Sequence, residues 1–182
     1  MPSELDNEWI QKALRRLGEL GIAAGIQIEL NIYGGSAMIL AYQIGRRTKD
    51  VDAIFTPREE VLKLSKQVAV ELSLDESWLN DEVKVFVAPF EQKRLLPLEF
   101  EGLRIQVPTA NYLLTMKALA ARRPAPGYPG DHSDLVFLIR KLEIHSVKEI
   151  QETIDKHFPD DVLPTDKAIY LEEIIEEVWS NE

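Results

Sequence analysis

Residues 33–55 read YGGSAMILAYQIGRRTKDVDAIF, and this stretch decides the predicted fold. Apolar and polar residues alternate over residues 26–33, which predicts a strand with one buried face. Gly34-Gly35-Ser36 ends that strand, a helix is expected over residues 37–44, and a second strand is expected over residues 48–55. A strand, a glycine turn, a helix and a return strand indicate a fold that mixes helices with a sheet.

The glycine turn has the composition of a phosphate-binding site. Two consecutive glycines let the backbone approach an anion closely, and a helix N-terminus presents unpaired N–H groups. Ser36 adds a hydroxyl and is expected to be the N-cap of the helix. We expect Gly35 to adopt a conformation, or to lie so close to bound phosphate, that a Cβ atom would not fit. The alternative is an ordinary strand-to-helix turn.

Two aspartates follow the turn after thirteen residues. In the predicted strand Asp50 and Asp52 share one face, with Cα atoms about 6.6 Å apart, while Val51 and Ala53 point into the core. Neighbouring carboxylates repel and raise each other's pKa, and a divalent cation relieves that conflict. One or two carboxylates, completed by water and substrate phosphate, are the ligands that Mg²⁺ takes. The alternative is a solvated strand edge.

The rest of the chain is predicted to contain short strands followed by helices. Helices are expected over residues 7–24, 57–74, 110–121, 133–142, 147–157 and 166–179, and short strands over residues 83–88, 95–100 and 104–107. Gly102 is expected to turn the last two strands into a hairpin. The predicted class is α/β, of the α+β kind, with a mixed-sheet core over residues 1–108. A helical region over residues 109–182 is expected to pack on it as one compact unit.

The composition excludes several classes of protein. With 182 residues, 45% of them apolar, the chain suits one globular domain, or a core with a small appendage. No apolar run approaches the ~20 residues of a membrane span, and the acidic start does not predict a signal peptide. The absence of cysteine excludes disulfides, thiolate metal sites and a cysteine nucleophile. We therefore expect a cytoplasmic protein without a membrane partner.

The net charge of −10 is concentrated at the C-terminal end. Residues 143–182 contain 12 acidic and 3 basic residues, against 19 and 18 in residues 1–142. The nearly neutral first part can host a polyanionic partner, whereas the acidic tail cannot line its site. Arg46, Arg47 and Lys49 form either a solvated turn or a basic rim that attracts a triphosphate or an RNA acceptor.

The stretch GGSAMILAYQIGRRTKDVDAIF resembles the signature of the nucleotidyltransferase superfamily, in which a glycine turn, a helix and an Asp-x-Asp strand follow one another. The segment RRTKDVD is more closely similar to AbiEii-like and related bacterial nucleotidyltransferases. LLTMKALAARR (residues 113–123) and GDHSDLVFLIRKL (residues 130–142) resemble the later lysine and Asp-x-x-Asp motifs of that group. The resemblance covers roughly residues 26–142 and implies the minimal DNA polymerase beta-like fold.

This resemblance implies a role for each matching residue of the first signature. Gly34, Gly35 and Ser36 would hold the phosphates of a nucleoside triphosphate. Asp50 and Asp52 would be catalytic and would bind Mg²⁺ or Mn²⁺.

The later motifs carry further expected roles. The resemblance implies that Lys117 and Asp134 are catalytic, and Asp131 and Arg47 are expected among the substrate-binding residues. We expect Lys117 to point into the same cleft as Asp50. The alternatives are a lysine that reaches past the core to water, and an acidic pair that caps a helix.

A third carboxylate is the point at which the sequence departs from the superfamily pattern. Many nucleotidyltransferases carry it on a later strand, where it binds metal and activates the acceptor hydroxyl. Glu99 and Glu101 are the candidates here, and solvent-facing strand positions are the alternative. In the AbiEii-like group the lysine and the late aspartate, Asp131 or Asp134, would serve instead.

The resemblance thus implies a metal-dependent nucleotidyltransferase that moves a nucleoside monophosphate from a triphosphate to a hydroxyl, whereas the residues by themselves supply a phosphate turn beside a metal-capable carboxylate pair. The acceptor is left open between RNA, a protein and a small molecule, and a toxin of a toxin–antitoxin pair is one role that the resemblance implies. A binding protein that has lost catalysis is the alternative. A further alternative is a protein whose acidic C-terminal helices dock a basic antitoxin or ribosomal surface.

Overall fold

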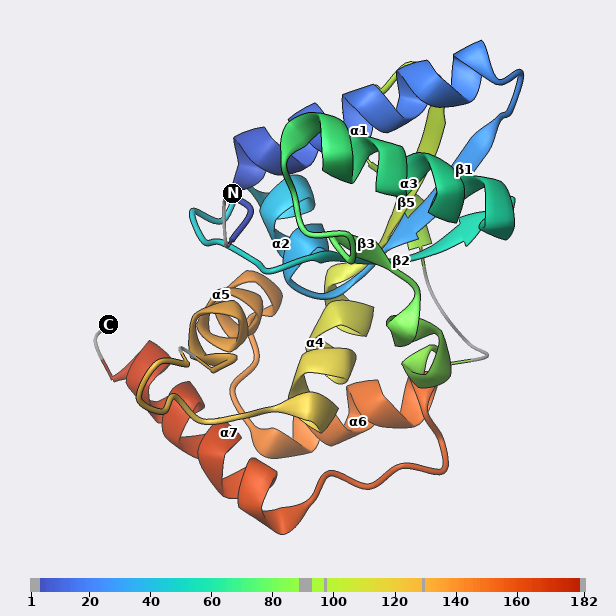
Figure 1. The fold of residues 1–182 in the computed structure, drawn as a ribbon. Coiled ribbons are helices and arrows are strands. Elements are labelled where there is room, and N and C mark those ends of the chain that lie inside the picture. Colours follow the sequence, from blue (N-terminus) through green and yellow to red (C-terminus); the bar gives the residue numbers. More distant parts are fainter. Residues whose placement is uncertain (1–3, 89–92, 97, 129, 181–182) are drawn as a thin grey trace. The chain divides into compact units, whose positions relative to one another are not determined.

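The computed structural model describes residues 4–88, 93–96, 98–128 and 130–180. The chain forms two compact units (Figure 1). Unit 1 is Met1–Phe86 with Lys93–Pro108, and unit 2 is Val87–Gln92 with Thr109–Glu182. In the described residues unit 1 holds a five-stranded mixed sheet with helices, and unit 2 is helical. The predicted α+β class is confirmed.

Unit 1 is built around the strand that precedes the glycine turn. Its elements are α1 (Asn7–Ala23), β1 (Ile28–Ile32), α2 (Gly34–Tyr42), β2 (Val51–Thr56), α3 (Arg58–Leu72), β3 (Leu79–Asn80), the 3₁₀ helix η1 (Glu82–Phe86), β4 (Lys93–Leu95) and β5 (Leu103–Pro108). The strand order is β3-β2-β1-β5-β4. β1 lies at the centre, antiparallel to β2 and parallel to β5. This order places the start of β2 beside the end of β1.

The core of unit 1 follows from the alternation in β1. Ile28, Leu30 and Ile32 are fully buried, whereas Glu29 is exposed. α1 packs on the buried face so closely that a Cβ on Gly21 would come within 2.8 Å of the Ile28 side chain. α1 also contacts α2 and α3 (Figure 1). The period-two pattern therefore predicted which face of the strand is buried.

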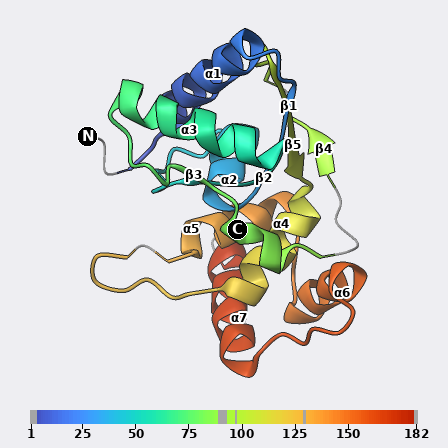
Figure 2. The same cartoon turned by 45° about the vertical axis from the view of Figure 1, so that its right-hand side comes forward.

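Unit 2 consists of helices that pack on one another. They are α4 (Ala110–Ala120), α5 (His132–Leu142), α6 (Val147–His157) and α7 (Thr165–Trp179). α4 contacts each of the other three (Figure 2). All four helices were predicted, with small differences at their ends. In the described part of the chain, no helix combines the length and hydrophobicity that a membrane crossing requires.

The strand predicted over residues 83–88 is wrong, because η1 occupies most of it. Asn80 Oδ1 accepts a hydrogen bond from the Glu82 N–H at 3.1 Å, and the Lys84 N–H donates to the Asp81 carbonyl at 3.2 Å. Such local hydrogen bonds of Asn and Asp favour turns over strands. No residue of η1 is buried, so its apolar residues do not form the buried face of a strand.

Two other strand boundaries also differ. β2 begins at Val51, not at the predicted residue 48, because Thr48 pairs with Leu5. The Leu5 N–H donates to the Thr48 carbonyl at 2.6 Å, and the Thr48 N–H donates to the Leu5 carbonyl at 2.9 Å. The hairpin partner of β5 is β4, which begins two residues before the strand predicted over residues 95–100. Pro97, within that predicted strand, lies outside the described residues. The polypeptide between α2 and β2 is therefore tied to the N-terminal segment.

Candidate active site

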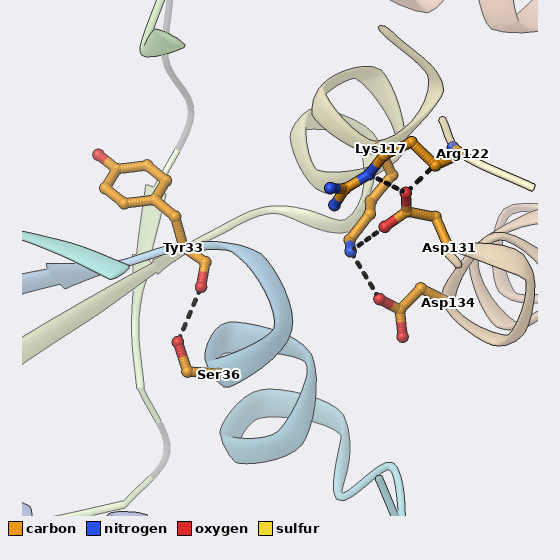
Figure 3. Close-up of polar contacts among 6 residues, drawn as sticks. All are labelled: Tyr33, Ser36, Lys117, Arg122, Asp131 and Asp134. Carbon is orange, nitrogen blue, oxygen red and sulfur yellow. Dashed lines mark hydrogen bonds and ion pairs between the residues drawn. The ribbon is translucent and has the colours of Figure 1, made fainter. Parts of the chain in front are cut away.

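The glycine turn is the first turn of α2. The helix begins at Gly34, its N-cap residue is Tyr33, and that side chain makes no capping hydrogen bond. The prediction that Ser36 is the N-cap is therefore wrong. Ser36 is 1% exposed, and its hydroxyl donates to the Tyr33 carbonyl at 2.9 Å (Figure 3). The first backbone N–H groups of a helix have no carbonyl partner within it, so this turn can receive an anion.

Gly34 is the position in the turn that requires glycine. Its φ of +59° lies in the left-handed region, and a Cβ there would come within 3.2 Å of Asp52 Oδ2. The Tyr33 N–H also donates to the Asp52 carbonyl at 2.9 Å, which ties the end of β1 to β2. The first turn of α2 and the Asp52 carboxylate therefore lie side by side.

Gly35 does not have a left-handed φ, so of the two reasons expected for its glycine only a close approach to bound phosphate stays a prediction. A Cβ on Gly35 would lie 3.3 Å from an Arg46 guanidinium nitrogen and 3.3 Å from Thr48 Oγ1. Both atoms are side-chain ends that can shift. Arg46 thus lies over the turn, whereas Arg47, the arginine assigned to substrate from the sequence, is exposed.

The two aspartates lie at the start of β2. Burial alternates along the strand, with Val51 and Ala53 fully buried and Asp52 half-buried, as the sequence predicted. Asp50 directly precedes the strand and is also half-buried. Burial, and after it the negative charges of Asp52 and Glu82, raises the pKa of Asp50 to about 6. The site therefore disfavours a second bare negative charge, and a cation would relieve it.

The two glutamates predicted as a third carboxylate do not lie at the end of the sheet that carries the glycine turn. Glu99 and Glu101 are exposed and precede β5, whose start pairs with Ile28 at the opposite end of β1 from the glycine turn. β5 itself contains no acidic residue. Glu82 of η1 is the acid whose charge acts on Asp50 after that of Asp52. No signal in the sequence singles out Glu82, because only the fold packs η1 against β2.

The donor set suits a hard divalent cation that also contacts substrate. Within the described ranges, no three His, Cys, Asp or Glu side chains come together as a complete metal site. Mg²⁺ requires no such cage, since one or two carboxylates, water and substrate phosphates satisfy it. Asp50 and Asp52 supply that number of oxygen ligands beside a helix N-terminus. The residues present therefore fit Mg²⁺ or Mn²⁺ together with a phosphate-bearing substrate.

Unit 2 brings the later motif residues together around one ammonium group. Lys117 of α4 lies 2.8 Å from Asp131 Oδ1 and 2.8 Å from Asp134 Oδ2 (Figure 3). The two carboxylates are almost completely buried, and the lysine side chain is 12% exposed. The Arg122 backbone N–H donates a hydrogen bond to Asp131 Oδ2 at 3.1 Å. The cluster links α4 to the start of α5.

This geometry excludes two of the interpretations of the later motifs. Asp131 is the N-cap residue of α5 but makes no capping hydrogen bond, so the interpretation of Asp131 and Asp134 as a helix cap is wrong. A lysine that reaches past the core to water is also wrong, because Lys117 is held by both carboxylates. The expected approach of Lys117 to Asp50 joins residues of different units and stays a prediction.

A family model described as a nucleotidyltransferase of unknown function (DUF6036) matches residues 21–161. The chain therefore belongs to this family, and the predicted membership of the nucleotidyltransferase superfamily is confirmed. The matched range includes both β1 with the glycine turn and the helices that carry the lysine–aspartate cluster. No curated protein and no solved structure is significantly similar to the chain.

Proposed function

We propose that this protein transfers a nucleoside monophosphate from a nucleoside triphosphate to a hydroxyl group, with a divalent cation held by Asp50 and Asp52. The observation that carries the proposal is the contact between Asp52 and the start of α2. A Cβ on Gly34 would lie 3.2 Å from Asp52 Oδ2, so a metal-capable carboxylate and an anion-binding turn share one place. A triphosphate with bound Mg²⁺ needs both.

Each residue has a defined part in this proposal. The N–H groups at the start of α2 hold phosphate oxygens, and Arg46 adds a positive charge over Gly35. Asp50 and Asp52 would hold Mg²⁺ or Mn²⁺, which supplies charge neutralisation on the phosphates when bound. Catalysis of this kind depends mainly on positioning and on electrostatic stabilisation.

Lys117 is the proposed contribution of unit 2. An ammonium group has three N–H donors, and two of them are directed to Asp131 and Asp134. The third donor would bind a phosphate oxygen, while the two carboxylates hold the ammonium group in place. Asp131 and Asp134 would then act on the substrate through Lys117.

The test is calorimetric titration of the protein with ATP, GTP, CTP and UTP in the presence of Mg²⁺ or Mn²⁺, followed by an assay of pyrophosphate release. Asp50→Asn and Asp52→Asn should abolish metal-dependent nucleotide binding. Glu60→Gln, which removes an exposed carboxylate of α3, should leave it unchanged and controls for net charge. A parent protein that binds no nucleotide with either metal refutes the proposal.

The absence of an acidic residue from β5 favours a second candidate, a nucleotide-binding protein without transferase activity. Nucleotide binding without pyrophosphate release on RNA, protein or small-molecule acceptors would support it. The AbiEii-like resemblance adds a toxin neutralised by an antitoxin to the first proposal. Expression of the parent in a bacterial host should then arrest growth, and Asp50→Asn should not.

A further inference from the structure

η1 is a short element held firmly at its beginning. The Asp81 carboxylate accepts hydrogen bonds from Arg58 Nε at 2.7 Å and from Lys84 Nζ at 3.0 Å. Asn80 Oδ1 accepts from the Glu82 N–H at 3.1 Å. These bonds connect η1 to α3 and to β3. The direction in which η1 presents its remaining side chains is therefore set by the fold of unit 1.

The side chains that η1 presents to solvent include two large apolar ones. Val85 is 72% exposed and Phe86 is 67% exposed. In the residues that the structure describes, Phe86 is the only Phe, Tyr or Trp side chain that is mostly exposed to solvent. An aromatic ring that stays exposed contributes no hydrophobic burial to the stability of the fold. Exposed apolar groups of this kind mark contact sites for ligands or partners.

The position of η1 ties this surface to the candidate active site. β3 runs parallel to β2, and Asn80 pairs with Asp52. η1 begins two residues after Asn80, packs against β2, and its Glu82 is near enough to Asp50 for their charges to interact. Phe86 lies four residues further, which is about 8 Å along a 3₁₀ axis. This rise is measured from Glu82, and a nucleoside triphosphate is long enough to span it between the metal-binding carboxylates and a base on Phe86.

We propose that Phe86, with Val85 beside it, is the subsite on which the base of the bound nucleoside triphosphate stacks. The inference rests on the proposed function and adds the recognition of the base to it. An aromatic face accepts any base, because every base has a π-face and stacking needs no matched hydrogen bonds. The subsite should therefore bind purine and pyrimidine triphosphates with little discrimination.

The experiment compares a ligand that has a base with one that has none. ATP and inorganic tripolyphosphate are titrated calorimetrically into the full chain with Mg²⁺, for the parent, Phe86→Ala and Phe86→Tyr. Phe86→Ala should weaken ATP binding by about tenfold and leave tripolyphosphate binding unchanged. Phe86→Tyr keeps the ring and should keep the affinity. Val70→Ala, which shortens another exposed apolar side chain of unit 1, should change neither.

The outcomes separate this inference from the proposed function. Unchanged ATP affinity in Phe86→Ala, or an equal loss for ATP and tripolyphosphate, overturns the stacking subsite while the metal and phosphate site stands. A parent that binds neither ligand overturns both. Sedimentation velocity tests whether a second copy of the chain occupies this surface instead. A parent dimer that dissociates in Phe86→Ala would show that it does, and would also overturn the inference.

Discussion

Asp50→Asn should make the metal-free protein more stable while it removes nucleotide binding. In the folded chain the pKa of Asp50 is raised from 3.8 to about 6, first by burial and then by the charges of Asp52 and Glu82. The folded state therefore binds more protons than the unfolded chain between those pH values. Its stability falls as the pH rises through this window and stays lower above it.

The size of the effect follows from the shift. About two pKa units correspond to an upper limit of about 3 kcal/mol at neutral pH. Because Asp50 is only half-buried, solvent screening reduces this free energy. We expect Asp50→Asn to raise the free energy of unfolding by about 1 kcal/mol. The gain should vanish below about pH 4, where the carboxyl group is protonated in both states. Glu82→Gln should give a smaller gain, since Glu82 acts after burial and Asp52.

The assay is urea denaturation of parent and Asp50→Asn in EDTA, at about pH 8, 6 and 4. The same series with Mg²⁺ and nucleotide should stabilise the parent and not the variant, because only the parent is expected to bind them. A variant that is less stable than the parent at pH 8, or a gain that persists at pH 4, would refute the electrostatic reasoning. If Asp50→Asn lost nucleotide binding with unchanged stability, only the expected size of the stability gain would be refuted.

Four further predictions concern single side chains. Gly34→Ala should destabilise the fold by about 1–2 kcal/mol in thermal or urea unfolding, because its φ of +59° is left-handed. Gly35→Ala, without that strain, should change the melting temperature little but weaken triphosphate binding in calorimetric titration. Lys117→Met leaves two buried carboxylates without their cation and should cost about 3–5 kcal/mol, whereas the exposed Lys148→Met should be neutral in the same measurement. Asp81→Asn should destabilise at neutral pH and lose this effect as the pH falls towards 2, since hydrogen bonds from Arg58 above all lower the pKa of Asp81 to about 2.

The sequence predicted the parts of the site that depend on neighbours along the chain. Alternation of apolar and polar residues identified the buried face of β1 and the half-buried position of Asp52. The glycine pair identified the turn, because glycine combines a left-handed backbone with a close approach, although the sequence pointed to Gly35 and the requirement falls on Gly34. Periodicity also located the four helices of unit 2.

Tertiary structure decided which distant residues meet. Asp131 and Asp134 have the spacing of a helix cap, yet both bind Lys117, which lies 14 and 17 positions earlier on another helix. Their burial makes an ion pair more favourable than a cap, since each carboxylate needs a cation where water is excluded. The case of η1 is different, because its alternating pattern predicted a strand and the local hydrogen bonds of Asn80 and Asp81 turn the backbone into a 3₁₀ helix instead. Local pattern therefore restricts the elements that a segment can form, whereas packing selects the distant partner that a buried polar group such as Asp134 binds.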